Sequence, residues 1–171
     1  MIDGKRPEGH NRGIKEVFMM TAILPGLPIV GVLRLTSRDG KTISQIEVVK
    51  GKSTGMNPFF DSCYNELEAY LTGKKKTLDL PLDTKGLTPF QSRVLKEMKK
   101  IPYGEVRSYA DLARAMKSKA FQAIGNACGK NPFMIIYPCH RVVGTKGPGG
   151  FAHGLKMKTE LLKLEGFSLA N

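Results

Sequence analysis

A thiol and an imidazole stand side by side in the segment YPCHRVVG, residues 137–144, where His140 directly follows Cys139. A cysteine attacks carbon as the thiolate, so near neutral pH it needs a base close by. His140 is suitable as that base, but successive side chains of an extended segment point to opposite faces. A bridging water, or a turn of the chain at this point, is therefore needed to connect the two groups.

Most free cysteines are inert core residues, and this is the alternative for Cys139. Its surroundings favour reactivity, because a proline and the polar pair His140-Arg141 flank it instead of aliphatic residues. The Gly-rich stretch GTKGPGGFAHG, residues 144–154, follows, and such a stretch is typical of a substrate loop. The apolar run FMIIYP, residues 133–138, predicts a short buried strand or extended segment that delivers the thiol to the edge of a site. We interpret Arg141 as a structural ion-pair partner.

The chain has three cysteines, an odd number, and the spacing of Cys63, Cys128 and Cys139 fits neither a disulfide framework nor a zinc ligand set. We therefore expect a reducing, intracellular compartment. The polar start MIDGKRPEGHNRG and the absence of any run of 18 apolar residues indicate neither secretion nor membrane insertion.

The charge indicates an anionic partner, since the formal net charge is +12. Residues 86–171 hold 14 Lys and Arg against 5 Asp and Glu, whereas residues 1–85 hold 13 against 10. The basic residues are scattered singly and do not form a polybasic tail. Nucleic acid is favoured over a lipid surface.

The first half is expected to form an antiparallel sheet. Three short β-rich runs cover residues 16–23, 29–37 and 42–50, and Arg-Asp-Gly at residues 38–40 is a hairpin signal. We expect roughly the first 14 residues to be disordered.

One helix follows the strands, over NPFFDSCYNELEAYLTGKK, residues 57–75. Phe60, Cys63 and Leu67 recur in it at helical spacing, together with Tyr70, so Cys63 is interpreted as core packing. A connector with two prolines comes next, and we place the domain boundary there, giving domains 1–85 and 86–171.

The second half is expected to be mostly helical. TPFQSRVLKEMKKIPYG, residues 88–104, has Thr88 as N-cap and Pro89 at the first helical position. SYADLARAMK begins with Ser108 and Asp111 in capping-box spacing.

The helix expected over SKAFQAIGNACGKNP, residues 118–132, makes a helix-turn-helix with the one before it. Helical hairpins are common, but basic residues around this pair favour DNA: Arg107, Arg114, Lys117, Lys119 and Lys130. Its small residues permit a close approach either to a groove or to another helix: Ala120, Ala123, Gly125, Asn126 and Ala127.

Residues 86–167 resemble the O6-alkylguanine-DNA alkyltransferases through TPFQSRVL, IPYGEVRSYADLA, AIGNA, NP, PCHRVV and LLKLEG. The resemblance implies an α+β fold, with a ribonuclease-H-like antiparallel sheet and helix at the N-terminus. The C-terminal domain is then mostly helical and winged-helix-like. Its helix-turn-helix binds the minor groove of double-stranded DNA, as a monomer, and the damaged guanine is flipped out.

The implied reaction is direct-reversal DNA repair, in which Cys139 takes the alkyl group from guanine O6, or from O4-alkylthymine, in a single turnover without metal or organic cofactor. In the family the motif histidine polarises a water that takes the thiol proton, and a glutamate orients the imidazole. These positions match His140 and Glu165. Asn131 matches the hinge asparagine between the recognition helix and the active site.

The resemblance also assigns residues to DNA and to the guanine pocket. The residues matched to DNA binding are Tyr109, Phe121, Gln122, Ala123, Gly125, Arg107 and Lys119. The pocket residues are Phe151, Ala152, Met134 and Cys128.

The chain departs from the family at two of these positions. Gln122 stands where an arginine usually replaces the flipped base, and the adjacent Phe121 is an alternative wedge between base steps. Phe151 stands where a tyrosine commonly lines the pocket, so the ring stacks without a hydroxyl.

Two other functions are to be compared with alkyl transfer. A non-transferring DNA-damage-binding protein would flag lesions, although the binding-only members of the family lack the cysteine present here at Cys139. A cysteine hydrolase would continue beyond one equivalent of product. The expected location is the nucleus in a eukaryote and the cytoplasm in a prokaryote.

Overall fold

The computed structural model describes residues 19–169, so the expectation for the extreme N-terminus lies outside the described residues. The first half contains the expected antiparallel sheet, in the order β1 (Met20–Ile23), β2 (Leu33–Ser37), β3 (Gln45–Val48). A buried row crosses the three strands, because Leu35 lies opposite both Ala22 and Ile46. The hairpin predicted at Arg-Asp-Gly joins β2 to β3.

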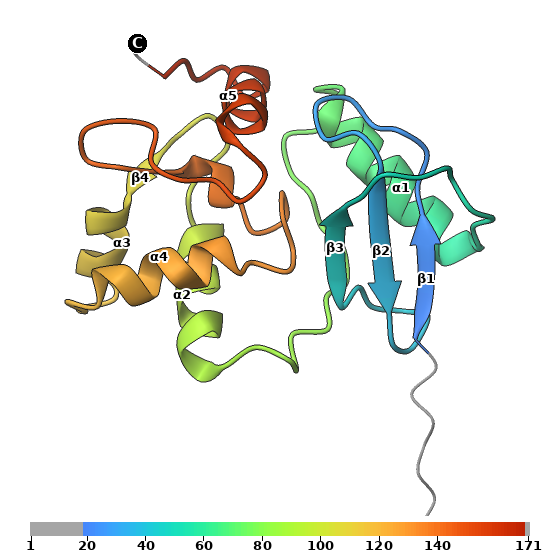
Figure 1. The fold of residues 1–171 in the computed structure, drawn as a ribbon, viewed down its shortest axis with the longest axis horizontal. Coiled ribbons are helices and arrows are strands. Elements are labelled where there is room, and N and C mark those ends of the chain that lie inside the picture. Colours follow the sequence, from blue (N-terminus) through green and yellow to red (C-terminus); the bar gives the residue numbers. More distant parts are fainter. Residues whose placement is uncertain (1–18, 170–171) are drawn as a thin grey trace, which may run out of the picture.

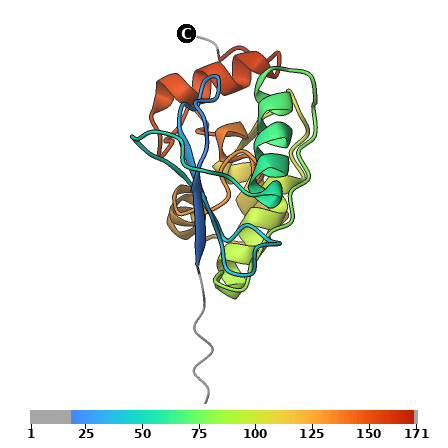
Figure 2. The ribbon, with the colours of Figure 1, turned by 90° about the vertical axis from the view of Figure 1, so that its right-hand side faces the viewer.

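Helix α1 (Pro58–Leu71) lies along one face of this sheet (Figure 2). It begins where predicted, since the side chain of Asn57 accepts a hydrogen bond from the amide of Phe60 at 3.0 Å. The face with Cys63 is buried, as its helical spacing indicates, and the Cys63 side chain belongs to the core.

The second half contains four helices: α2 (Pro89–Lys99), α3 (Tyr109–Ala115), α4 (Phe121–Gly129) and α5 (Leu155–Leu164). Thr88 caps α2, and Ser108 forms the capping box with Asp111 that starts α3. Helix α4 packs against both α2 and α3, which is the expected helix-turn-helix arrangement. Two short strands, β4 (Arg107–Ser108) and β5 (Val142–Val143), pair in parallel beside them.

The segment 133–138 is neither a strand nor extended, so that prediction is wrong. The amide of Tyr137 donates to the carbonyl of Phe133 at 2.9 Å, and Ile135 has a φ of +73°. All six residues are buried, and an apolar run that is buried on every side has no period from which its conformation can be predicted.

The two halves meet at the β3 edge of the sheet, which is the strand nearest the helical half in Figure 1. The amide of Ile46 in β3 donates to the carbonyl of Pro132, just after α4, at 2.8 Å. Among residues 19–169, no helix has the length and apolar character needed to cross a membrane.

Candidate active site

Cys139 lies in a turn, because residues Cys139–Arg141 form the short 3-10 helix η1. The amide of Cys139 donates to the carbonyl of Tyr137 at 2.8 Å, and the amide of Arg141 donates to that of Pro138 at 2.9 Å. The chain therefore turns at Cys139, which is one of the two features, a turn or a bridging water, that could connect the thiol with the imidazole. The thiol stays partly exposed while His140 is buried completely.

His140 is held in one tautomer by a carboxylate. Its Nε2 lies 2.6 Å from Oε1 of Glu165, and both side chains are buried. A carboxylate only accepts hydrogen bonds, so Nε2 carries the proton and Nδ1 keeps its lone pair. Within residues 19–169, Nδ1 is the one buried side-chain nitrogen or oxygen without a hydrogen-bond partner.

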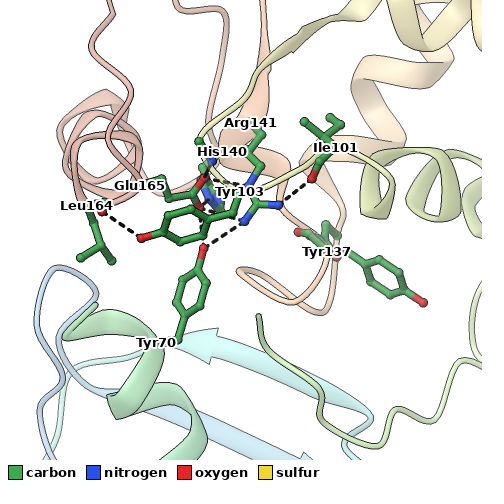
Figure 3. A network of polar contacts seen from close by, with 10 residues as sticks. Tyr70, Ile101, Tyr103, Tyr137, His140, Arg141, Leu164 and Glu165 are labelled. Carbon is green, nitrogen blue, oxygen red and sulfur yellow. Dashed lines mark hydrogen bonds and ion pairs between the residues drawn. The ribbon is translucent and has the colours of Figure 1, made fainter. Parts of the chain in front are cut away.

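Glu165 is the C-cap residue of α5, and its carboxylate accepts from several donors (Figure 3). Arg141 donates from Nε to Oε2 at 2.8 Å and from Nη2 to Oε1 at 3.1 Å. Gly104 donates its amide to Oε2 at 3.1 Å, and the Tyr70 hydroxyl donates to Oε1. Burial alone would raise the pKa of Glu165, but the hydrogen bonds outweigh it and lower the pKa to about 2. The group is therefore an anion at neutral pH.

Arg141 is the ion-pair partner that the sequence indicates. Besides Glu165, its guanidinium donates to the carbonyl of Ile101 at 2.7 Å and lies over the ring of Tyr103, 5.8 Å from the centroid. The three groups fix the arginine from three sides, so Glu165 is fixed in turn.

Burial dominates the titration of both reacting groups. It raises the pKa of the Cys139 thiol, against the hydrogen bond from Asn131, and it lowers the pKa of His140, against the attraction of Glu165. At neutral pH the thiol is protonated and the imidazole is neutral, which is the pair of states that proton transfer from sulfur to nitrogen requires.

Asn131 contacts the thiol from the segment after α4. Its Nδ2 donates to the carbonyl of Tyr137 at 2.7 Å and reaches Sγ of Cys139 at 3.4 Å, while its Oδ1 accepts from the amide of Phe133 at 3.0 Å. The side chain thus closes the turn of residues 133–138 and orients the sulfur.

A cavity of about 140 Å³ opens in front of the thiol. It is lined by Tyr109, Gly125, Cys128, Gly129, Cys139, Gly150, Phe151 and Ala152. Three of the expected pocket residues are among them, but Met134 is not: it is buried in the core, where it pairs with Tyr137 in the turn.

The glycine-rich loop beside the cavity is held by a buried lysine. Lys158, in α5, donates from Nζ to the carbonyls of Val142 at 2.5 Å, Pro148 at 2.6 Å and Gly150 at 3.2 Å. Burial lowers the pKa of Lys158 to about 8. The loop also requires Gly149, whose φ is +69° and where a Cβ would lie 2.8 Å from the amide nitrogen of Gly144.

Helix α4 presents an exposed face next to this cavity. Phe121, Gln122 and Ala123 are exposed at its start, with 53% of Phe121 accessible, while Gly125 lines the cavity one turn later. Arg107 and Lys119 are exposed as well, and Tyr109 is half-buried at the cavity.

Asn131 contacts Sγ of Cys139 and Glu165 contacts His140, and the two pairs are joined by the chain at η1. Sequence reasoning missed three supporting residues: Tyr70 and Gly104, which donate to Glu165, and Lys158, which holds the glycine-rich loop. The signal for Lys158 is its place three and four residues before Leu161 and Leu162, on the apolar face of α5. For Tyr70 the sequence indicates only a buried aromatic residue, and nothing in it indicates the contact with Glu165. In the described part of the chain, no cluster of His, Cys, Asp and Glu is suitable for a metal ion.

Two family models match the chain. Residues 89–167 match the DNA binding domain of 6-O-methylguanine DNA methyltransferase, and residues 31–84 match the ribonuclease-like domain of the same family.

Curated relatives and solved structures agree with these matches. A methylated-DNA--protein-cysteine methyltransferase of Methanosarcina barkeri is 40% identical over 146 residues, covering 80% of this chain and 91% of the relative. That of Sulfurisphaera tokodaii is 42% identical over 114 residues, covering 67% and 72%. The crystal structure of Mycobacterium tuberculosis OGT in complex with DNA is 35% identical and has a TM-score of 0.73, covering 85% of this chain and 91% of that one.

Proposed function

The chain belongs to the 6-O-methylguanine DNA methyltransferase family, and from this membership we propose that Cys139 is the residue that accepts the alkyl group. The protein repairs DNA by direct reversal, moving a methyl group from DNA to a cysteine of its own chain. Of the three cysteines, Cys63 is buried in the core and Cys128 is nearly as buried, while Cys139 alone is partly exposed. The accessible thiol at the cavity is the one that a substrate carbon can reach.

The proposed reaction is a direct displacement. A water between Sγ and Nδ1 of His140 takes the thiol proton and passes its own proton to Nδ1, so that imidazolium forms beside the Glu165 carboxylate. The thiolate forms a bond to the methyl carbon while the carbon–O6 bond breaks, the electron pair stays on guanine, and guanine then takes up a proton at N1 while the imidazolium returns its proton to water. A thioether and an unmodified base remain, and no step regenerates the thiol.

One observation carries this mechanism: Glu165 holds the proton of His140 on Nε2, and Nδ1 has no protein partner although it is buried. A buried imidazole nitrogen without a partner is costly unless it serves a purpose such as proton transfer. The lowered pKa of the imidazole keeps this nitrogen unprotonated near neutral pH.

We assign the cavity to the flipped base. Phe151 offers a ring for stacking, and the backbone amides around Ala152 are available to donate to O6. Cys128 and Gly125 bound the space in which the alkyl group sits.

The DNA-binding element is proposed to be α4, entering the minor groove, with the protein acting as a monomer. Its small residues allow close approach, and the exposed Phe121 and Gln122 stand where a side chain must fill the gap left by the base. Arg107 and Lys119 are placed to contact phosphates on either side.

We also propose that the chain divides into two domains near residue 85. The family models match on either side, at 31–84 and 89–167, and the segment between α1 and α2 contains only the single bridge of Leu82 with Ile43.

The assignment of Cys139 is tested with two matched variants. Cys139→Ala should bind duplex DNA containing O6-methylguanine as the wild type does, and should transfer no methyl group, because the side chain lacks a nucleophile. Cys63→Ala should transfer one equivalent. Transfer by Cys139→Ala, or continued product formation beyond one equivalent in the wild type, would contradict the proposal.

A further inference from the structure

We propose that Tyr70, a residue of the N-terminal sheet-and-helix half, is a positioning residue for the proton relay of the C-terminal half. Its hydroxyl sets how strongly Glu165 attracts the proton on His140. The inference rests on the proposed roles of Cys139 and His140.

The geometry directs the tyrosine proton to one oxygen. Tyr70 lies in the last turn of α1, is 1% exposed, and points toward the network from the opposite side to η1 (Figure 3). Nη2 of Arg141 donates to its hydroxyl oxygen at 3.2 Å, so the hydroxyl gives its own proton to Oε1 of Glu165. Oε1 is the same oxygen that accepts from Nε2 of His140.

Two donors on one carboxylate oxygen share its electron density. When His140 takes up a proton, the attraction between imidazolium and Glu165 stabilises the charged ring. A hydroxyl that donates to the same oxygen weakens this attraction and keeps the imidazole less basic. Tyr70 thereby holds His140 in the neutral form that accepts the thiol proton.

Packing alone does not account for a tyrosine here. The ring meets that of Tyr103 edge-on, with centroids 6.0 Å apart and an angle of 84°, and a phenylalanine would make the same contact. The hydroxyl is what connects α1 to the Glu165 carboxylate, and burial of the group raises its pKa, so it remains a donor.

Other charged and titratable groups also face this pair, and removing the hydroxyl takes from them only the contact of Arg141 Nη2 with its oxygen. They are Arg141 and Cys139 from η1, Lys158 from α5, and Tyr103 from the segment after α2. Arg141 in particular keeps its own contacts with both oxygens of Glu165. A change in the titration of His140 on removing the hydroxyl is therefore assigned to Tyr70.

The test is the pH dependence of the single-turnover rate constant with duplex DNA containing O6-methylguanine, in wild type and Tyr70→Phe. The acid limb of the profile should move to higher pH in Tyr70→Phe, because the imidazole becomes more basic. Transfer below the midpoint should slow by roughly 3- to 10-fold, and the plateau at higher pH should change by about 2-fold or less. Duplex binding should be unchanged.

A second variant guards against a folding defect. A monofluorinated tyrosine at position 70 keeps the hydroxyl and its volume but donates more strongly, so it should move the acid limb the opposite way, to lower pH. Tyr64→Phe is the matched control: Tyr64 is also in α1 and its hydroxyl donates to Glu68 at 3.0 Å, away from the site. Its profile should match the wild type.

Two results would overturn the inference: an acid limb that stays in place in both Tyr70 variants, or one that moves the same way in both. Failure of the proposed function itself would look different, since the wild type would then transfer no methyl group to Cys139 at any pH.

Discussion

The protonation state of His140 is set by the carboxylate beside it and by its burial. Its Nε2 donates a hydrogen bond to Oε1 of Glu165 at 2.6 Å, and burial disfavours a second proton on the ring. Burial raises the pKa of the Cys139 thiol, so in the proposed mechanism the imidazole is the base that takes up the thiol proton through a water. The chemistry of the site depends on the pair and not on either residue alone.

This pairing predicts the pH dependence of transfer. Burial lowers the pKa of His140 below its usual 6.5, so the base form persists through neutral pH and is lost only as the pH falls through that lowered value. The single-turnover rate constant should be level near pH 7 and decrease at acid pH. His140→Ala should slow transfer about 10²- to 10⁴-fold and abolish the acid limb. A rate that rises steeply above pH 8 in the wild type would instead indicate unaided ionisation of the thiol.

Removing a base from the DNA stack costs on the order of a few kcal/mol, and the side chain that fills the gap must offset this cost. Gln122 is one candidate for that side chain. Arginine stacks and donates more hydrogen bonds, so Gln122→Arg should speed transfer from duplex DNA and leave the reaction with free O6-benzylguanine unchanged. If Phe121 is the wedge, Phe121→Ala should slow duplex repair and spare the free base. Should neither variant change duplex repair, α4 is not the element that enters the groove.

At the scale of elements, the end of α5 is fixed by the loop after α2. A Cβ at Gly104 would lie 2.9 Å from the carbonyl oxygen of Glu165, and the φ of +79° favours glycine. Gly104→Ala should lower the free energy of unfolding by about 1–3 kcal/mol and slow transfer, because it displaces Glu165. Thermal unfolding and single-turnover kinetics measure the two effects. Lowered stability with normal transfer would show that Glu165 tolerates the shift.

Lys158 connects α5 to the loop over the cavity. Lys158→Met should leave the carbonyl of Val142 in β5 and two loop carbonyls, of Pro148 and Gly150, without their donor, lowering the free energy of unfolding by about 2–4 kcal/mol and exposing residues 144–150 to proteases. Lys156→Met, on the exposed side of the same helix, is the control. Equal protease resistance in both variants would contradict a role of Lys158 in holding the loop.

The elements themselves were predictable where local chemistry decides them. Thr88 and Ser108 marked helix starts because their side chains cap the backbone, and the hairpin at residues 38–40 followed from its glycine. The turn at residues 133–138 was not predictable, because its shape depends on Asn131 and on burial from all sides. Tyr70 was predicted to be buried, but its partner is 95 residues away and sequence spacing carries no information about that contact.

At the scale of the molecule, the halves are chemically unequal. The second half carries the excess of basic residues and the thiol, while the first adds one hydroxyl to the network. Cys139 and His140 were predictable as neighbours in the chain. The family resemblance implies Glu165 beside His140, but the pairing of Arg141 with the same carboxylate required the fold, which brings the end of α5 against η1.

The charge predicts how the protein binds undamaged duplex. Phosphate contacts release counterions, so affinity should decrease with salt with a log–log slope of about −0.9 for each phosphate contacted. Charge reversal at Arg107 or Lys119 should weaken binding to all sequences similarly and make the slope shallower. Fluorescence anisotropy over a range of salt measures this, and an affinity independent of salt would contradict the assignment.

The central claim is that the protein removes the alkyl group by taking it permanently onto Cys139. Intact-mass measurement after incubation with duplex DNA containing O6-methylguanine tests it directly, followed by peptide mapping. We expect one added methyl group per molecule, on the peptide that contains Cys139. An unchanged mass, or a methyl group on Cys63 or Cys128, would contradict the account.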